Sequence, residues 1–213
     1  LNLPFPYKDA AAPISPYNLA GLKSAVSIQG KLNDPASMDE SWCVEVAIPW
    51  ESLKSFHRNG YACPKLGEYW RVNFSRVEWD VACRESEIYK IPNRPEYNWV
   101  WSAQGVIDMH RPERWGFAYF LEAGMEAPKK LPPVEILKER AMEMYYWQKH
   151  FADSREGSRG AFLSKEALIP HLSSECAAAL RELTLTSGHY LAHFHDHDNA
   201  LDLFITDKSQ VIF

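Results

Sequence analysis

Aromatic and amide side chains gather between Trp79 and Trp101, a stretch that the sequence predicts to be a long loop. Trp99 and Trp101 offer flat apolar rings, and Asn98 offers both a hydrogen-bond donor and an acceptor. A sugar needs this combination, because its C–H faces stack on rings while its hydroxyls form hydrogen bonds. Long loops on a rigid scaffold are also a usual place for recognition. We therefore expect these residues to bind carbohydrate; the alternative is that either tryptophan only closes one end of the fold.

Four further polar residues are candidates for contacts with the same ligand. Gln104 and His110 lie in predicted loops close to the tryptophans. Arg71 and Asn73 lie on the polar face of a predicted strand, where a guanidinium and an amide could bind hydroxyl groups. Arg76 has the parity of the apolar face of that strand, which predicts a buried arginine paired with a carboxylate.

Three segments with the period of two that is typical of β-strands must position these groups, namely 42–48, 69–77 and 115–120. A further strand is predicted over 22–32. Pro49 cannot donate a backbone hydrogen bond, so it ends the first of the three strands and is expected to begin a short helical turn.

Four pieces of the chain resemble, in order and spacing, the family-9 type of carbohydrate-binding module. They are 41–50 (SWCVEVAIPW), Pro64 with Gly67, 70–76 (WRVNFSR) and 109–116 (MHRPERWG). The resemblance covers roughly residues 17 to 121 and is strongest to the branch found in Bacteroidetes-type secreted proteins. It implies a mostly β fold, an antiparallel jelly-roll-like β-sandwich that holds sugars between aromatic side chains. It also implies export to the periplasm or the cell exterior and association with glycoside hydrolases.

The chain departs from that family in two places. The family's sandwich begins upstream of the position of Leu1, and one of its ligand-stacking rings lies in that upstream part. The second stacking ring aligns near Met109, where this chain has no aromatic side chain. We therefore expect an N-terminal segment or a separate chain to complete the sandwich, with the loop tryptophans as the stacking rings.

The composition changes after residue 122, where prolines and lysines over 123–133 predict a linker. Apolar residues then recur at three and four positions, which predicts an amphipathic helix over 134–151. Residues 1–122 are thus expected to form the sandwich and 134–213 an α+β appendage. After the long helix the appendage is predicted to contain short helices at 165–172 and 174–183 and strands at 189–195, 201–205 and 210–212.

Two clusters could bind metal ions. His193, His195 and His197 recur at every second residue, so on a strand their imidazoles would share one side, as a zinc or nickel site needs. The alternative is a solvated hairpin tip, because the run ends in turn-forming residues. The loop 33–40 holds three carboxylates and could bind calcium, or it is a solvated turn. We expect no obligatory cofactor, with calcium as the open alternative.

The overall composition restricts the class of protein. Hydrophobic residues make up 46% and charged residues 24%, which is typical of an ordinary folded protein, and the chain has no apolar run long enough to span a membrane. The formal net charge of -5 gives no general attraction to nucleic acid. The four cysteines show no CxxC pair or metal-ligand spacing, which predicts mostly free, partly buried thiols; one or two disulfides in an oxidising compartment are the alternative.

Three functions remain open. The first is non-catalytic carbohydrate binding in polysaccharide breakdown. The second is a glycoside hydrolase, which needs two carboxylates roughly 5 to 10 Å apart across a cleft; Glu45, Asp80, Asp108 and Glu113 are available, but no local motif pairs them. The third is a structural or partner-binding domain.

Overall fold

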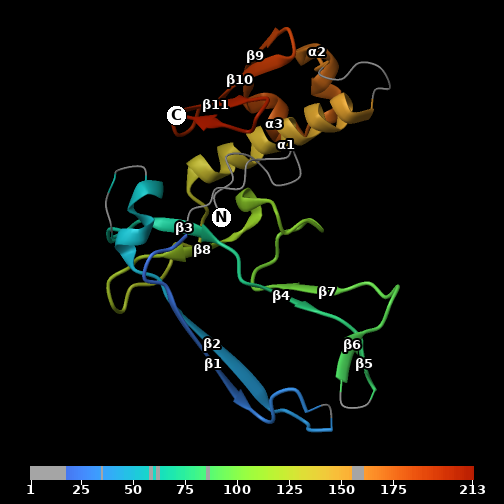
Figure 1. The fold of residues 1–213 in the computed structure, drawn as a ribbon. Helices are drawn as coiled ribbons and strands as arrows, with labels where there is room; N and C mark the ends of the chain where they lie inside the picture. Colours follow the sequence, from blue (N-terminus) through green and yellow to red (C-terminus); the bar gives the residue numbers. More distant parts are fainter. Residues whose placement is uncertain (1–17, 35, 58–59, 61–62, 85–86, 155–160) are drawn as a thin grey trace. The chain divides into compact units, whose positions relative to one another are not determined.

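The computed structural model describes residues 18–34, 36–57, 60, 63–84, 87–154 and 161–213 (Figure 1). Strands predominate in several antiparallel sheets, and helices are the minority. In the described part, the chain forms two compact units. The first comprises 18–104 and 116–125, and the second comprises 105–115 and 126–213.

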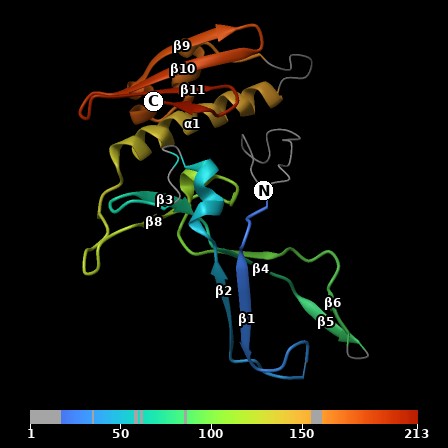
Figure 2. The same cartoon turned by 60° about the vertical axis from the view of Figure 1, so that its left-hand side comes forward.

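The strands of the first unit form four separate two-stranded antiparallel sheets, which we call ribbons (Figures 1 and 2). The ribbons are β1 (Lys23–Gln29) with β2 (Ser41–Ala47), β3 (Tyr69–Val72) with β8 (Gly116–Tyr119), β4 (Ser75–Glu78) with β7 (Tyr97–Val100), and β5 (Val81–Arg84) with β6 (Glu87–Lys90).

The expected sandwich is not confirmed, because no ribbon of the described first unit is covered by a second sheet layer. In the β1–β2 ribbon, Val26 lies opposite Val44 and Ile28 opposite Trp42, so one face is apolar as the alternation predicts. Trp42 and Val44 are nevertheless half exposed. Only two of the described residues of this unit are buried, Ser52 and Gln104.

A small aromatic cluster holds the β3–β8 ribbon to a 3₁₀ helix, η1 (Trp50–Phe56). The rings of Trp50, Trp70 and Phe120 contact one another edge to face, with centroids 5.1 to 5.9 Å apart. The helical turn expected after Pro49 is therefore confirmed, with the proline as its N-cap residue.

The single strand predicted over 69–77 is wrong in one respect. The chain leaves the strand conformation at Asn73 and Phe74, so that β3 pairs with β8 while β4 pairs with β7. The alternation of side chains runs through both pieces, so the pattern alone does not show the change of partner. The loop predicted over 79–101 is also wrong, because it contains β5, β6 and β7.

The second unit packs one long helix, α1 (Pro133–Ser154), against a four-stranded antiparallel sheet (Figures 1 and 2). The strand order is β12-β11-β10-β9, with β9 at Leu180–Thr186, β10 at His189–Asp196, β11 at Leu201–Thr206 and β12 at Val211–Ile212. Two short helices, α2 (Lys165–Leu168) and α3 (Ser174–Ala179), and two 3₁₀ turns, η2 (Pro112–Arg114) and η3 (Ile169–His171), complete the unit.

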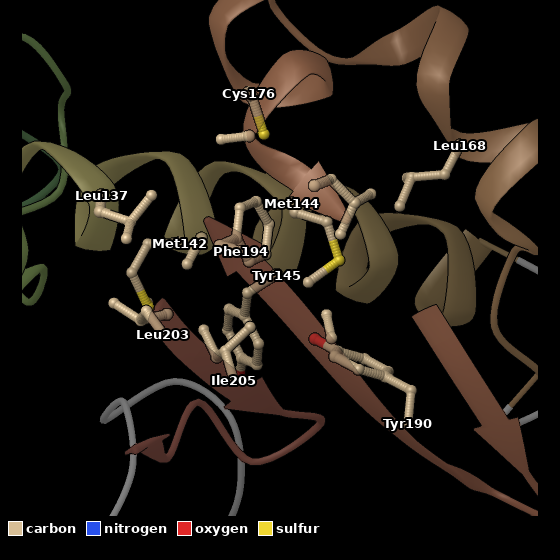
Figure 3. Close-up of a cluster of buried hydrophobic side chains, with 14 residues drawn as sticks. Leu137, Met142, Met144, Tyr145, Leu168, Cys176, Tyr190, Phe194, Leu203 and Ile205 are labelled. Atoms are coloured by element: carbon tan, nitrogen blue, oxygen red, sulfur yellow. The ribbon is translucent and has the colours of Figure 1, made fainter. Parts of the chain in front are cut away.

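The core of the second unit lies between α1 and the sheet (Figure 3). Leu137 and Met144 of α1 meet Phe194, Leu203 and Ile205 of the strands, and all five are fully buried. This arrangement confirms the amphipathic helix that the sequence predicts. The helix predicted over 174–183 ends early, because the chain becomes β9 at residue 180.

Candidate functional site

The β4–β7 ribbon places most of its aromatic side chains on one face. In the register of this antiparallel pair, Arg76 lies opposite Trp99 and Glu78 opposite Tyr97, and opposed residues share a face. The backbone N–H of Trp101 donates to the carbonyl of Phe74 at 3.0 Å, which extends the same alternation by one pair. We call this face the aromatic face; it consists of Phe74, Arg76, Glu78, Tyr97, Trp99 and Trp101.

The rings of the aromatic face are accessible to solvent. Phe74 is 64% exposed, Trp99 61%, Tyr97 50% and Trp101 48%. Within the described part of the chain, both tryptophan rings are exposed and neither is buried at the end of a core, as the alternative interpretation of the sequence would require. Successive residues on one face of a strand are about 7 Å apart, so Tyr97, Trp99 and Trp101 form a row of ring surfaces that an extended ligand could contact together.

Trp101 is held in place by three interactions. Its indole Nε1–H donates to the carbonyl of Val72 at 3.0 Å, and its ring contacts Phe74 edge to face at 5.3 Å. A Cβ at Gly116 would lie 2.6 Å from Cζ2 of the indole, so only glycine allows the ring this position. The ring is therefore fixed before any ligand binds, which reduces the entropy cost of binding.

Two charged side chains lie among the rings. Arg76 Nη2 and Glu78 Oε2 form an ion pair at 3.0 Å, and the Arg76 guanidinium also lies 5.7 Å from the ring of Trp42. Both side chains of the pair are about half exposed. The prediction that Arg76 is paired is confirmed, but the prediction that it is buried is wrong, since no second sheet layer covers this ribbon in the described structure.

The end of the ribbon is braced by polar contacts. Arg94 donates to Asp80 at 2.8 Å, and this hydrogen bond raises the pKa of the Arg94 guanidinium. The indole N–H of Trp79 donates to Glu96 at 3.1 Å, and the Lys90 ammonium lies 5.0 Å from its ring centroid. Trp79 is thus an exposed tryptophan with local partners, outside the aromatic face.

Three of the predicted polar site residues lie close to the aromatic face without being part of it. Asn98 is on the opposite face of β7, paired with Val77, and its amide donates to Glu96 at 3.4 Å. Gln104 is 6% exposed, and its Nε2 has no hydrogen-bond partner in the described structure. The buried Oδ1 of Asn73 also lacks such a partner.

The two remaining predicted residues lie farther along the chain. Arg71 is on β3, with its guanidinium stacked 3.9 Å from the ring centroid of Phe117. His110 belongs to the second unit, and its backbone N–H donates to Asp108 at 3.1 Å. The structure therefore places Trp99 and Trp101 on one face, while Arg71 belongs to the β3–β8 ribbon and His110 to the other unit.

The histidines at 193, 195 and 197 gather around one carboxylate. His193 Nε2 and His195 Nδ1 lie 2.7 and 2.9 Å from Asp202 Oδ1, and His197 contacts the ring of His195 at 4.6 Å. The two hydrogen bonds lower the pKa of Asp202. Within the described ranges, no group of three metal-ligating side chains has an arrangement that could hold an ion.

The acidic loop over 33–40 uses its carboxylates for turn contacts. Asp34 Oδ1 accepts from the N–H of Ala36 at 3.0 Å, and Asp39 Oδ1 accepts from the N–H of Lys31 at 2.9 Å and from Ser37 Oγ at 3.1 Å. These are contacts of an ordinary solvated turn.

Four members of the aromatic face are not among the site residues predicted from the sequence, namely Phe74, Arg76, Glu78 and Tyr97. A signal for Tyr97 was present, because Tyr97, Trp99 and Trp101 recur at every second residue. The position of the other three depends on how β4 pairs with β7 across a gap in sequence, and no local pattern reports that register.

Comparisons with protein-family models, with curated proteins and with solved structures found no match. None of the helices in the described ranges combines the length and the apolar character that a membrane crossing requires.

Proposed function

We propose that the chain is a non-catalytic carbohydrate-binding module that holds a saccharide on the aromatic face of the β4–β7 ribbon. The observation that carries the proposal is the row formed by Tyr97 and Trp99 of β7 and by Trp101 directly after it, three exposed rings at every second residue. The resemblance to family-9 modules supports the same ligand class, and it favours a periplasmic or extracellular role in polysaccharide breakdown.

The chemistry of the aromatic face suits a sugar better than a purely apolar ligand. The rings present flat apolar surfaces, while Arg76 and Glu78 place donors and acceptors between them. Because the two charges compensate each other, the aromatic face favours a polyhydroxylated ligand over an ion of either sign. The three rings of the row are spaced along the chain direction, so we expect it to bind along a chain of sugar units.

A glycoside hydrolase is the alternative enzymatic function. Its general acid needs a pKa raised above the usual range of a carboxyl group. The aromatic face has one carboxylate, Glu78, in an ion pair with Arg76. Five described carboxylates have a pKa that clearly departs from the usual value, and in each of them the pKa is lowered. They are Glu68, Glu166, Glu175, Asp196 and Asp202. None of these five groups belongs to the aromatic face, which offers rings for stacking but only one carboxylate, so its composition favours binding.

A structural or partner-binding role is favoured by a different observation. The apolar face of the β1–β2 ribbon carries Val26, Trp42 and Val44, all substantially exposed. Two-stranded ribbons are marginally stable alone, which supports covering of this face by an N-terminal segment or by a separate chain. Because the Arg76 guanidinium of the aromatic face lies 5.7 Å from the ring of Trp42, the two faces adjoin, and such a layer would compete with a sugar for part of the aromatic face.

The test is a screen of the chain against soluble and immobilised polysaccharides and oligosaccharides. We expect saturable binding to at least one glycan, a shift of tryptophan fluorescence on binding, and weaker binding by the Trp99→Ala and Trp101→Ala variants. Absence of binding across a broad panel would overturn the proposal. Release of reducing ends from a bound glycan, lost on replacing one carboxylate, would establish the hydrolase instead.

A further inference from the structure

The second unit contains an open cleft of about 340 Å³ along α1. Its floor is one side of the helix, where Glu139, Glu143 and Trp147 recur at intervals of four residues. Its wall is the turn η2, which contributes Arg111 and Arg114. All of these residues belong to the second unit, so the cleft does not depend on the position of the aromatic face.

Besides its glutamates, the floor of the cleft carries two aromatic rings. Trp147 is 38% exposed and lies at a tilt against His171, with ring centroids 5.1 Å apart. Tyr146 lies beside it, and the Arg111 guanidinium stacks 3.6 Å from its ring centroid. The contacts with His171 and Arg111 fix both rings, so the exposed part of Trp147 is a rigid apolar surface that faces a polar wall.

The arginines of the wall keep hydrogen-bonding capacity. Arg114 Nη1 lies 3.8 Å from Glu139 Oε2, and Arg111 Nε lies 3.7 Å from Asp108 Oδ2. Both separations are too long for hydrogen bonds, although the charges attract each other. Arg111 Nε is also buried without a hydrogen-bond partner in the described structure. The Nε atom of Arg111 is shielded from contact, whereas the side chain of Arg114 is 36% exposed and can donate to an acceptor oxygen of a ligand in the cleft.

The cleft is lined by charges of both signs, the carboxylates of Glu113, Glu139 and Glu143 and the guanidinium groups of Arg111 and Arg114. Arg114 lies near Glu139, and Glu143 accepts hydrogen bonds from the backbone N–H and the hydroxyl of Ser173 at 2.6 and 2.8 Å. An anion would meet the glutamates, and a cation would meet the two arginines. A neutral ligand with many hydroxyl groups can instead accept from a guanidinium, donate to a carboxylate and stack on an indole in one position.

We propose that the cleft on α1 is a second binding site, separate from the aromatic face, for one or two units of a neutral saccharide. The sugar stacks on Trp147, and its hydroxyl oxygens accept hydrogen bonds from Arg111 and Arg114. The volume lies at the small end of the range for ligand sites in proteins, which restricts the site to a short ligand.

The experiment is calorimetric titration of the whole chain with neutral monosaccharides and their β-1,4- and α-1,4-linked dimers. A Trp99→Ala/Trp101→Ala variant removes the two tryptophan rings of the aromatic face and leaves the cleft; adding Tyr97→Ala removes the third ring of the row. We expect this variant to keep saturable sugar binding, and a further Arg114→Met substitution to weaken that binding about tenfold or more, as loss of a charged hydrogen-bond donor does. The matched control is Arg181→Met, an exposed arginine on β9 outside the cleft.

A spectroscopic measurement covers the case in which the double variant does not fold. In the wild-type chain labelled with ¹⁵N, the indole N–H signal of Trp147, assigned with Trp147→Phe, moves on sugar addition if the cleft is occupied. If the wild type binds sugar and this signal does not change, the cleft is not a sugar site. The proposal for the aromatic face is then unaffected. If the Trp147 signal moves and Trp99→Ala keeps the wild-type affinity, the sugar binds in the cleft, and the aromatic face is overturned as the sugar site. Tighter binding of lysine methyl ester or of N-acetylglutamate than of any sugar also overturns the proposal.

Discussion

Replacing Trp99 by alanine is the most informative substitution on the aromatic face. A free tryptophan side chain exposes roughly 230 Å², and Trp99 is 61% exposed. About half of the exposed surface of Trp99, or roughly 70 Å², belongs to the ring face that a sugar would cover. At about 25 cal/mol per Å² this contact contributes about 1.8 kcal/mol, which is roughly a 20-fold change in Kd.

The assay is titration of the best-binding glycan of the screen into wild type and Trp99→Ala, with Kd measured by calorimetry. Trp79→Ala is the matched control, because Trp79 is also exposed but its indole contacts Glu96 and Lys90 away from the aromatic face. We expect the control to change Kd less than twofold. An unchanged Kd in Trp99→Ala, or an equal loss in Trp79→Ala, would refute the reasoning from the aromatic face.

Three other predictions follow from single residues. Gly116→Ala places a Cβ 2.6 Å from the indole of Trp101, so we expect glycan affinity to fall as it does in Trp101→Ala; unchanged affinity in calorimetry would contradict the contact. Burial raises the pKa of Cys176 to about 12, so a thiol reagent at pH 8 should modify the three exposed cysteines in the folded chain and the fourth only after denaturation. The pKa of Asp202 is lowered from 3.8, so its contact with the histidines stabilises the fold above that pH and is lost as the pH falls through the lowered value. The urea midpoint of unfolding should therefore fall less between pH 5 and 3 in Asp202→Asn than in the wild type. If the two proteins show the same dependence of the midpoint on pH, the contact of Asp202 with the histidines does not stabilise the fold.

The second unit was largely predictable because its signals are local. The recurrence of Leu137, Ala141, Met144 and Tyr145 at three and four residues marks the buried side of α1, and all four are buried against the sheet. The strands β10 and β11 were found from their alternation. The start of β9 was missed, because the apolar residues that follow Ala179 fit a helix as well as a strand.

The first unit was less predictable because its features depend on partners distant in sequence. Alternation showed which side of β2 is apolar, but it cannot show whether another layer covers that side. The short strands β5, β6 and β7 carry charged and aromatic residues in four-residue pieces, which is too little for a clear period. Trp99 and Trp101 were found by residue type, whereas Arg76 joined them only through the pairing of β4 with β7.

The most direct test of sugar binding on the aromatic face is a glycan titration of the ¹⁵N-labelled chain that follows the indole signals of its eight tryptophans. The account predicts that Trp99 and Trp101 move together along one saturation curve while Trp79 stays in place. A bound glycan that moves Trp79 or Trp50 and leaves Trp99 unchanged would contradict it.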